Sequence, residues 1–133
     1  MAKFPSAEWA ELLEAAVNAN GEYAEAAEAW EGDVLLRVVL DPPSTPPPGI
    51  ALDLAHGTCR SARYHADSRE TSTEFVFEAT PAIWREILEG RLEPVKSVVS
   101  GKLRVRGNLA KVMRFTRASG LLIATAATIP TEF

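Results

Sequence analysis

The residues of this sequence that could carry out chemistry lie close together near its middle. The two histidines and the single cysteine, His56, Cys59 and His65, fall within ten positions of one another. Such residues bind zinc or form nucleophilic pairs. On one strand, however, Cys59 and His65 would be about 20 Å apart, too far to bind the same ion. His56, beside a turn, could approach only Cys59, which gives at most two ligands where zinc needs three or four. We therefore expect neither a metal site nor a catalytic cysteine, and assign these residues structural or surface roles.

Motifs of other enzyme classes are missing from the sequence as well. It contains no glycine-rich phosphate loop, no G-x-S-x-G elbow and no H-E-x-x-H pair. The carboxylates of Glu8, Glu11 and Glu14 recur at helical spacing, which is typical of a solvated helix face. We therefore expect no catalytic residue, no cofactor and no enzymatic activity.

Composition limits the remaining classes of protein. The chain has 133 residues, 47% hydrophobic, with a net charge of −4, which predicts one domain over residues 1–133 with a core of its own. The acidic balance argues against nucleic acid as a partner. One cysteine excludes an intrachain disulfide framework and favours a reducing compartment, so we expect the cytoplasm. No apolar stretch is long enough to predict a membrane span.

Local patterns predict helices at both ends and strands between them. Ser6, Thr80 and Asn108 are expected helix N-caps, and Gly120 is expected to break or kink the last helical region. Alternating apolar residues, or at 33–40 an apolar and β-branched run, predict strands, arranged as an antiparallel meander. A proline-rich loop is expected at 41–49. The expected helices cover 6–18, 22–30, 80–90, 93–101 and 108–129, and the expected strands cover 33–40, 49–57, 58–65, 72–80 and 102–107.

Charge separates strongly along the chain. Residues 1–33 carry a net charge of −7, whereas residues 94–118 carry seven basic residues and no acidic one. Two interpretations stay open. The two segments are solvated or partly face each other, or the basic segment forms an anion site for a phosphate-bearing ligand or an acidic membrane surface. The apolar side chains of the C-terminal half likewise form either core alone or core that encloses a pocket.

Two motifs late in the chain carry a resemblance to a known family. "WREILEGRL", from Trp84 to Leu92, fits W-x-x-[IL]-x-x-G-x-[LV], and "GKLRVRGN", from Gly101 to Asn108, fits G-K-[LI]-x-[VI]-x-G-[ND]. Together with "EWAELLEAAVNANGEYAEAAEAWEGDVLLRV" and "GIALDLAHGTCRSAR", the sequence resembles the stand-alone bacterial members of the sterol-carrier-protein, or nonspecific lipid-transfer, family. The resemblance implies an α/β (α+β) fold with an antiparallel sheet of about five strands. Helices cover one face of that sheet, with a helical pair at the N-terminus and C-terminal helices that close an apolar cavity.

The same resemblance implies a lipid-binding role without chemistry. The expected ligand is a fatty acid, an acyl-coenzyme A or a related lipid. The residues implied to line its pocket are Trp84, Ile87, Leu88, Val98, Val99, Leu103, Val105, Leu109, Val112, Met113 and Phe115. The expected partners of an anionic head are Lys102, Arg104, Lys111, Arg114 and Arg117. Transient contact with an anionic membrane is expected to accompany this role.

An alternative function uses the same side chains. Apolar C-terminal helices can form the seam of a homodimer or dock on a partner as readily as they enclose a ligand. A third interpretation, acyl-group transfer assisted by Cys59 or His65, has less support from the spacing. Co-purified lipid would favour the first function, and a lipid-free dimer the second.

Overall fold

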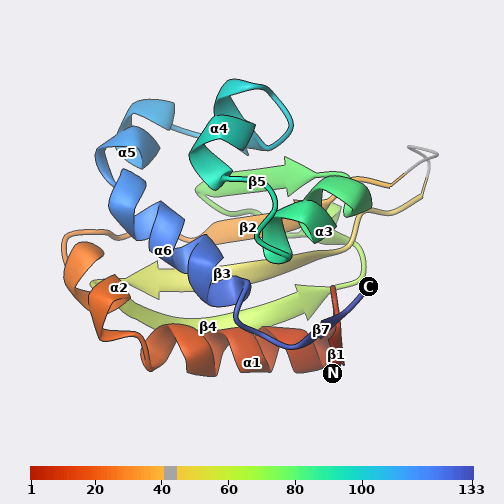
Figure 1. Ribbon diagram of the computed structural model, residues 1–133, viewed down its shortest axis with the longest axis horizontal. Helices are drawn as coiled ribbons and strands as arrows, with labels where there is room; N and C mark the ends of the chain where they lie inside the picture. Colours follow the sequence, from red (N-terminus) through yellow and green to blue (C-terminus); the bar gives the residue numbers. More distant parts are fainter. Residues whose placement is uncertain (41–44) are drawn as a thin grey trace.

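A five-stranded sheet forms the centre of the structure, a computed structural model that describes residues 1–40 and 45–133 (Figure 1). The strands lie in the order β4-β3-β2-β5-β6. The loop expected at 41–49 falls in part on residues 41–44, outside the described residues. The bounds are β2 Val34–Val38, β3 Gly49–Ala55, β4 Thr58–His65, β5 Phe75–Ala79 and β6 Arg104–Arg106.

The sheet is mixed, so the prediction of a purely antiparallel meander is wrong at one strand pair. β5 lies parallel to β2, with Val34 opposite Phe75 and Leu36 opposite Phe77, whereas the other three pairs are antiparallel. The chain after β4 crosses back over the sheet and adds β5 beside β2. Alternation of side chains is the same for both strand directions, so the pattern could not distinguish them.

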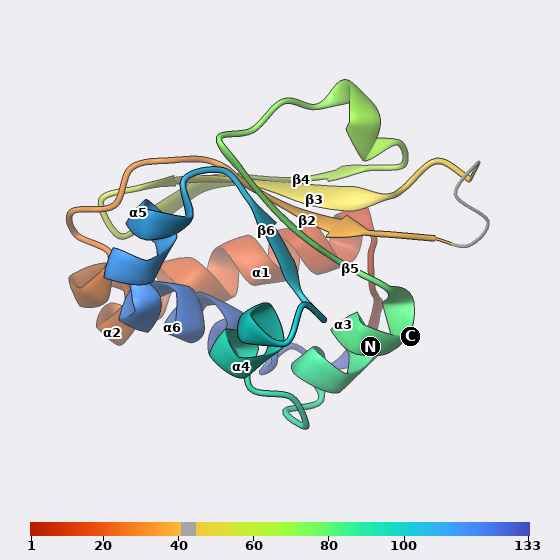
Figure 2. The same cartoon turned by 90° about the horizontal axis from the view of Figure 1, so that it is seen from above.

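All six helices of the described residues lie on one face of the sheet, as expected, while the segment that contains the short 3-10 helix η1 (Ser68–Glu70) crosses the other face (Figure 2). We call these the helix face and the open face. The helices are α1 Ala7–Asn18, α2 Gly21–Ala26, α3 Pro81–Leu88, α4 Pro94–Val99, α5 Leu109–Arg114 and α6 Thr116–Ala126. No helix in residues 1–40 and 45–133 is long and apolar enough to cross a membrane.

Helix ends follow the predicted capping chemistry. Ser6, Thr80 and Asn108 each accept a hydrogen bond from a backbone N–H in the first turn of their helices, at 3.1–3.3 Å, which confirms all three expected N-caps. The predicted break at Gly120 is wrong. Helix α6 passes through Gly120, and the break comes at Phe115, whose φ of −109° and ψ of 35° are not helical.

Two very short strands close the fold. β1 (Ala2–Lys3) pairs in parallel with β7 (Thr131–Glu132), which brings the two described ends of the chain together. The Trp9 indole N–H donates to the Thr131 hydroxyl at 3.0 Å, and the rings of Phe4 and Trp9 lie 4.6 Å apart. No sequence pattern predicted this pair, because two residues are too few for alternation to be detected.

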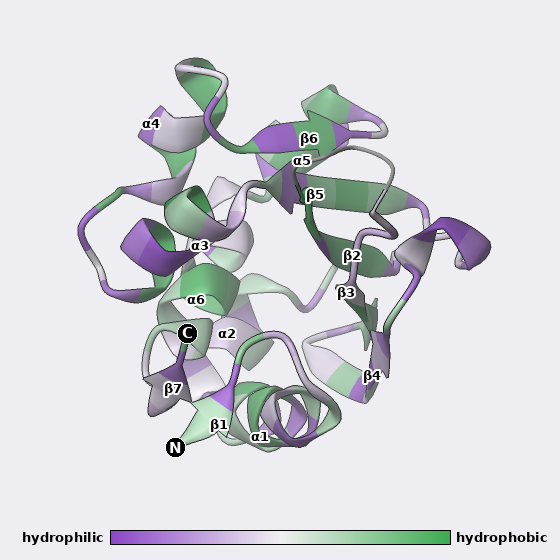
Figure 3. Ribbon diagram, turned by 90° about the vertical axis from the view of Figure 1, so that its right-hand side faces the viewer, coloured by the Kyte–Doolittle hydropathy of each residue, from purple (hydrophilic) through white to green (hydrophobic). Residues whose placement is uncertain are grey.

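The core lies between the sheet and the helices. In β2 and β5, Val34, Leu36, Phe75 and Phe77 are buried in this core, and Figure 3 shows these two strands as largely hydrophobic. In β6, only Val105 packs against the core, while Arg104 and Arg106 are exposed. Alternation along this edge strand therefore places apolar and cationic side chains on opposite faces of the sheet.

Candidate functional site

An apolar hollow lies on the helix face, between the strands β5 and β6 and the helices α4, α5 and α6. It measures about 40 Å³. Among the lining residues that the structure describes, the only side-chain polar groups are the hydroxyls of Thr116 and Ser119. The Thr116 hydroxyl donates to the carbonyl of Met113 at 2.6 Å. The lining residues are Phe77, Pro94, Val95, Val98, Val99, Leu103, Val105, Leu109, Val112, Met113, Thr116, Ser119, Gly120 and Ile123.

Three helices present these side chains because of their spacing in the sequence. Val95, Val98 and Val99 recur on one face of α4, which begins at Pro94 under the Glu93 cap. Leu109, Val112 and Met113 repeat the pattern on α5, and Thr116, Gly120 and Ile123 on α6. The strand side is closed by Val105, which stands opposite Phe77 in the β5–β6 register.

The structure brings seven of the eleven expected pocket residues together at this hollow. They are Val98, Val99, Leu103, Val105, Leu109, Val112 and Met113. The other four lie elsewhere. Trp84, Ile87 and Leu88 of α3 are buried in the core, and Phe115 packs edge-to-face on the Trp30 ring at 5.2 Å.

Seven lining residues were absent from the expected set. Phe77 could have been found by pairing its strand with the Val105 strand, but the register needed for this is not visible in the sequence. Thr116, Ser119 and Gly120 are small or polar, so a search for periodic apolar residues does not detect them. Pro94, Val95 and Ile123 lie at helical spacing from other lining residues, so helical periodicity could have identified them.

The outer rim of the hollow carries exposed apolar side chains. Val99 is 80% exposed, and Leu109 and Met113 are each 47% exposed. These three residues, which we call the rim, belong to α4 and α5. Large apolar side chains grouped at a hollow are typical of a surface that meets a ligand, a membrane or a second protein.

None of the five cations expected at an anionic head lines the hollow. Lys111 is held elsewhere, because its ammonium donates to the Glu31 carbonyl at 2.7 Å and lies 5.0 Å from the Trp30 ring centroid. Arg114 and Arg117 are exposed on α5 and α6, and Arg114 follows the rim residue Met113. No ion pair joins the acidic segment 1–33 to the basic segment 94–118, both fully described.

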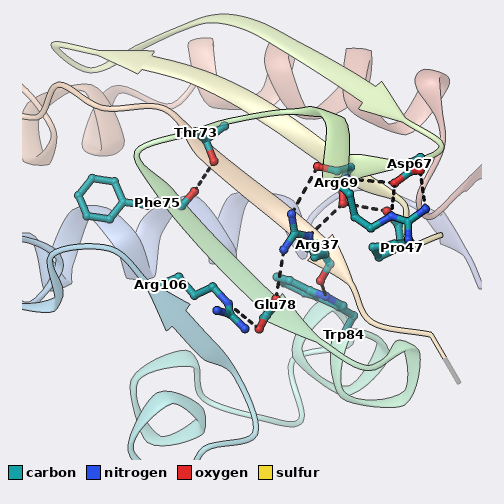
Figure 4. Close-up of polar contacts among 10 residues, drawn as sticks. Arg37, Pro47, Asp67, Arg69, Thr73, Phe75, Glu78, Trp84 and Arg106 are labelled. Carbon is teal, nitrogen blue, oxygen red and sulfur yellow. Dashed lines mark hydrogen bonds and ion pairs between the residues drawn. The ribbon is translucent and has the colours of Figure 1, made fainter. Parts of the chain in front are cut away.

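Lys102 and Arg104 line a different concavity, on the open face. This groove measures about 640 Å³. At its base the buried carboxylate of Glu78 lies between two arginines (Figure 4). The lining residues are Arg37, Val39, Leu40, Thr45, Pro47, Arg69, Glu78, Ala79, Thr80, Ile83, Gly101, Lys102, Arg104 and Arg106. Strand β6 separates this groove from the apolar hollow.

The cysteine and histidines are not brought together into a reactive site. Burial first, and the nearby Glu14 carboxylate second, raise the pKa of the Cys59 thiol to about 12, so it stays protonated and unreactive at neutral pH. His65 lies at the opposite end of β4, and a ring nitrogen of His56 is 3.0 Å from the Glu28 carbonyl. Within residues 1–40 and 45–133, no three histidine, cysteine or acidic side chains are placed to hold a metal.

Comparison with known proteins gives consistent results. The family model described as "SCP-2 sterol transfer family" matches residues 10–119. A crystal structure of sterol carrier protein 2 is 33% identical, with a TM-score of 0.89, over 96% of this chain and 99% of that one. A solution structure of a conserved hypothetical protein from Thermus thermophilus, described as a candidate sterol carrier protein, is 32% identical, with a TM-score of 0.86, over 99% and 93%.

More distant structures share the fold. Sterol carrier protein 2 from Yarrowia lipolytica is 13% identical, with a TM-score of 0.59, over 90% of this chain and 89% of that one. No curated protein sequence matches the chain significantly.

Proposed function

The chain belongs to the SCP-2 sterol transfer family, and from this premise we propose that it binds and carries a hydrophobic acyl ligand in the hollow between α4, α5, α6 and β6. The observation that carries the proposal is the lining of that hollow, in which twelve of the fourteen described residues have no side-chain polar group. An acyl chain needs such a surface, since each methylene removed from water contributes about 0.8 kcal/mol. This role requires no reaction and no cofactor. The buried Cys59 thiol, with its raised pKa, is unsuited to act as a nucleophile.

Ligand entry requires the hollow to widen. Its volume of about 40 Å³ is far below the ~300–1,000 Å³ that is typical of small-molecule sites. The elements that move apart in this proposal are α4 and α5, each six residues long. Both border the hollow with partly exposed residues of the rim, so an entering chain displaces side chains that already contact water.

The head of an anionic ligand lies at the rim beside Arg114. This residue directly follows Met113, which lines the hollow, and its own side chain is exposed. Arginine pairs with a carboxylate or a phosphate through two parallel hydrogen bonds. The alternation along β6 directs Arg104 to the opposite face, and Lys111 is engaged by Glu31 and Trp30, so these two cations are less suited to the role.

The same rim is the surface through which the protein exchanges lipid with an anionic membrane. Val99, Leu109 and Met113 supply exposed apolar area, and the segment 94–118 around them has seven basic residues and no acidic one. Apolar insertion together with basic residues is the combination that binds anionic bilayers. We retain the cytoplasm as the expected compartment, because the single cysteine suits a reducing environment.

Native mass spectrometry of freshly purified protein, followed by solvent extraction, tests the proposed function. We expect an acyl lipid at one per chain. Gly120→Leu sharpens the test, because Gly120 lines the hollow in helical backbone and a Cβ there meets no atom within 4 Å. The new side chain should fill the hollow and weaken binding of a fluorescent fatty acid at least about tenfold, while improved helix propensity preserves the fold.

Ala124→Leu is the matched control, since Ala124 lies on the same helix but is exposed and does not line the hollow. It should bind the fatty acid as the wild type does. Equal binding by the Gly120→Leu protein would place the ligand elsewhere and contradict the proposal.

A second function, homodimer assembly, is favoured by the exposure of Val99, Leu109 and Met113. A lipid-free protein with the mass of a dimer, insensitive to Gly120→Leu but made monomeric by Leu109→Ser, would support assembly instead. Light scattering coupled to size exclusion measures this mass.

A further inference from the structure

A row of alternating charge crosses three strands on the open face. Arg37 on β2 stands directly opposite Glu78 on β5, and Glu78 stands directly opposite Arg104 on β6. Arg106 follows two residues later on the same side of β6. Neighbouring strands lie about 4.8 Å apart, so this register places one carboxylate between cations on both sides.

Glu78 positions two of these arginines. Its Oε1 accepts from the Arg106 Nε at 2.9 Å, and its Oε2 lies 3.5 Å from the Arg37 Nη1 (Figure 4). The carboxylate side chain is only 7% exposed. Arg37 is fixed further by Ser68, whose hydroxyl accepts from the Arg37 Nε at 3.0 Å while donating to the Pro47 carbonyl at 2.8 Å. The base of the groove is therefore a connected set of hydrogen bonds and ion pairs.

Cations outnumber carboxylates around the groove. Among residues 1–40 and 45–133, five basic side chains line it, namely Arg37, Arg69, Lys102, Arg104 and Arg106, against the single carboxylate of Glu78. Asp67, outside the lining, neutralises Arg69 at 2.8 Å. Over the described part of the chain, Lys102 and Arg104 make no ion pair, and Arg106 uses only its Nε on Glu78. The groove therefore carries an excess of positive charge within these residues.

The groove also has an apolar wall. Val39, Leu40, Ala79 and Ile83 line it beside the arginines, and Val39 is 38% exposed. The volume of about 640 Å³ lies within the usual range of small-molecule sites, with no need for the groove to open. This lining suits a ligand that combines an anionic group with an uncharged body.

We propose that this groove is a second ligand site, which binds a small organic phosphate. The phosphate contacts Arg104, Arg106 and Lys102, and the uncharged part of the molecule packs on Val39, Leu40 and Ile83. Arginine presents paired donors that match phosphate oxygens, and several such donors in one groove favour phosphate over a single carboxylate. A concave site fits a small molecule better than it fits a flat bilayer, where the recessed Arg37 and Glu78 would take no part.

Isothermal titration calorimetry at low ionic strength tests the site, with phenyl phosphate and inorganic phosphate as the probes. We expect saturable binding of both, tighter for phenyl phosphate because its ring contacts the apolar wall. Arg104→Gln should weaken phenyl phosphate at least about tenfold, the loss expected for hydrogen bonds to a charged group. Arg63→Gln is the control, since it removes the same charge from an exposed position on β4 that does not line the groove, and it should change the affinity less than about twofold.

Several outcomes would overturn the proposal. Absence of saturable binding of either probe to the wild type is one, and equal weakening by Arg104→Gln and Arg63→Gln is another. Flotation with phosphatidylglycerol vesicles supplies a third. If vesicle binding depends on Arg104 while neither free phosphate binds, the open face meets a membrane and holds no small molecule. Thermal melts of both variants confirm that any loss of binding comes from folded protein.

Discussion

The two faces of the sheet differ in almost every physical property, although β6 contributes to both. On the helix face, Val105 closes an apolar hollow of about 40 Å³, whereas on the open face Arg104 and Arg106 line a charged groove of about 640 Å³. The charged groove is therefore unsuited to an acyl chain despite its larger volume. The apolar lining of the hollow suits such a chain, but the hollow must widen to admit it. The comparison indicates that the polarity of the lining residues determines what a concavity can bind more strongly than its volume does.

The faces also differ in what stabilises them. The helix face buries large side chains such as Trp9, Trp84 and Phe75, each at most 1% exposed, and burial of this kind contributes several kcal/mol per residue. The open face is held by polar contacts of Glu78 and Ser68 with Arg37, and by the ion pair of Glu78 with Arg106. Salt screens mainly the Arg106 pair, because Arg106 is 64% exposed whereas Arg37 and Glu78 are largely buried. Variants on the two faces should therefore respond differently to truncation and to ionic strength.

The largest effect is expected from Trp84→Ala on the helix face. Trp84 is 1% exposed, and its indole N–H donates to the Arg37 carbonyl at 2.9 Å, so truncation leaves a cavity and an unpaired acceptor. We expect a loss of about 3–5 kcal/mol in the free energy of unfolding, measured by urea denaturation. Val39→Ala, at a 38% exposed position of the open face, should cost less than about 1 kcal/mol. Similar losses in both variants would remove the contrast between the faces.

A smaller effect is expected from Glu78→Gln on the open face. The neutral amide keeps the shape of the side chain but withdraws the charge that Arg37 and Arg106 share. We expect a loss of about 1–2 kcal/mol that shrinks in high salt, measured by urea denaturation at two ionic strengths. Glu74→Gln removes a more exposed partner of Lys111 and should have little effect. A salt-independent loss would show that the buried contact with Arg37, and not the exposed pair with Arg106, carries the effect.

The smallest effect is expected from charge reversal at the rim. Arg114→Glu should weaken binding of a fatty acid about fivefold, because an exposed charge acts through water at roughly 1 kcal/mol, and should leave a fatty alcohol unaffected. Arg104→Glu should leave both lipids unaffected while abolishing phenyl phosphate binding. Competition with a fluorescent fatty acid and calorimetry measure the two ligands. If either variant weakened both ligands equally, the two faces would not be independent sites.

Much of the fold was predictable because its signals are local. The caps at Ser6, Thr80 and Asn108 depend on contacts within one turn, and every strand of the central sheet was identified by alternation or, for β2, by an apolar, β-branched run. The same applies to the hollow on α4 and α5, where helical spacing brings Val98, Val99, Leu109, Val112 and Met113 to one side. Local patterns failed at Gly120, because α6 continues through it. The break lies instead at Phe115, whose ring packs on Trp30.

The sequence by itself determined which residues are apolar or charged, where helices and strands form, and which side chains share a face of each element, because these properties depend on neighbours within a few positions. Only the tertiary structure decided that β5 lies parallel to β2, that Trp84 belongs to the core, and that Lys102 and Arg104 meet Arg37 and Glu78 on the open face. Those outcomes depend on which strands become neighbours and in what direction, and alternation is unchanged by either choice. Alternation in the sequence therefore predicted that β6 has one apolar and one cationic face, but it did not predict which residues each face would meet.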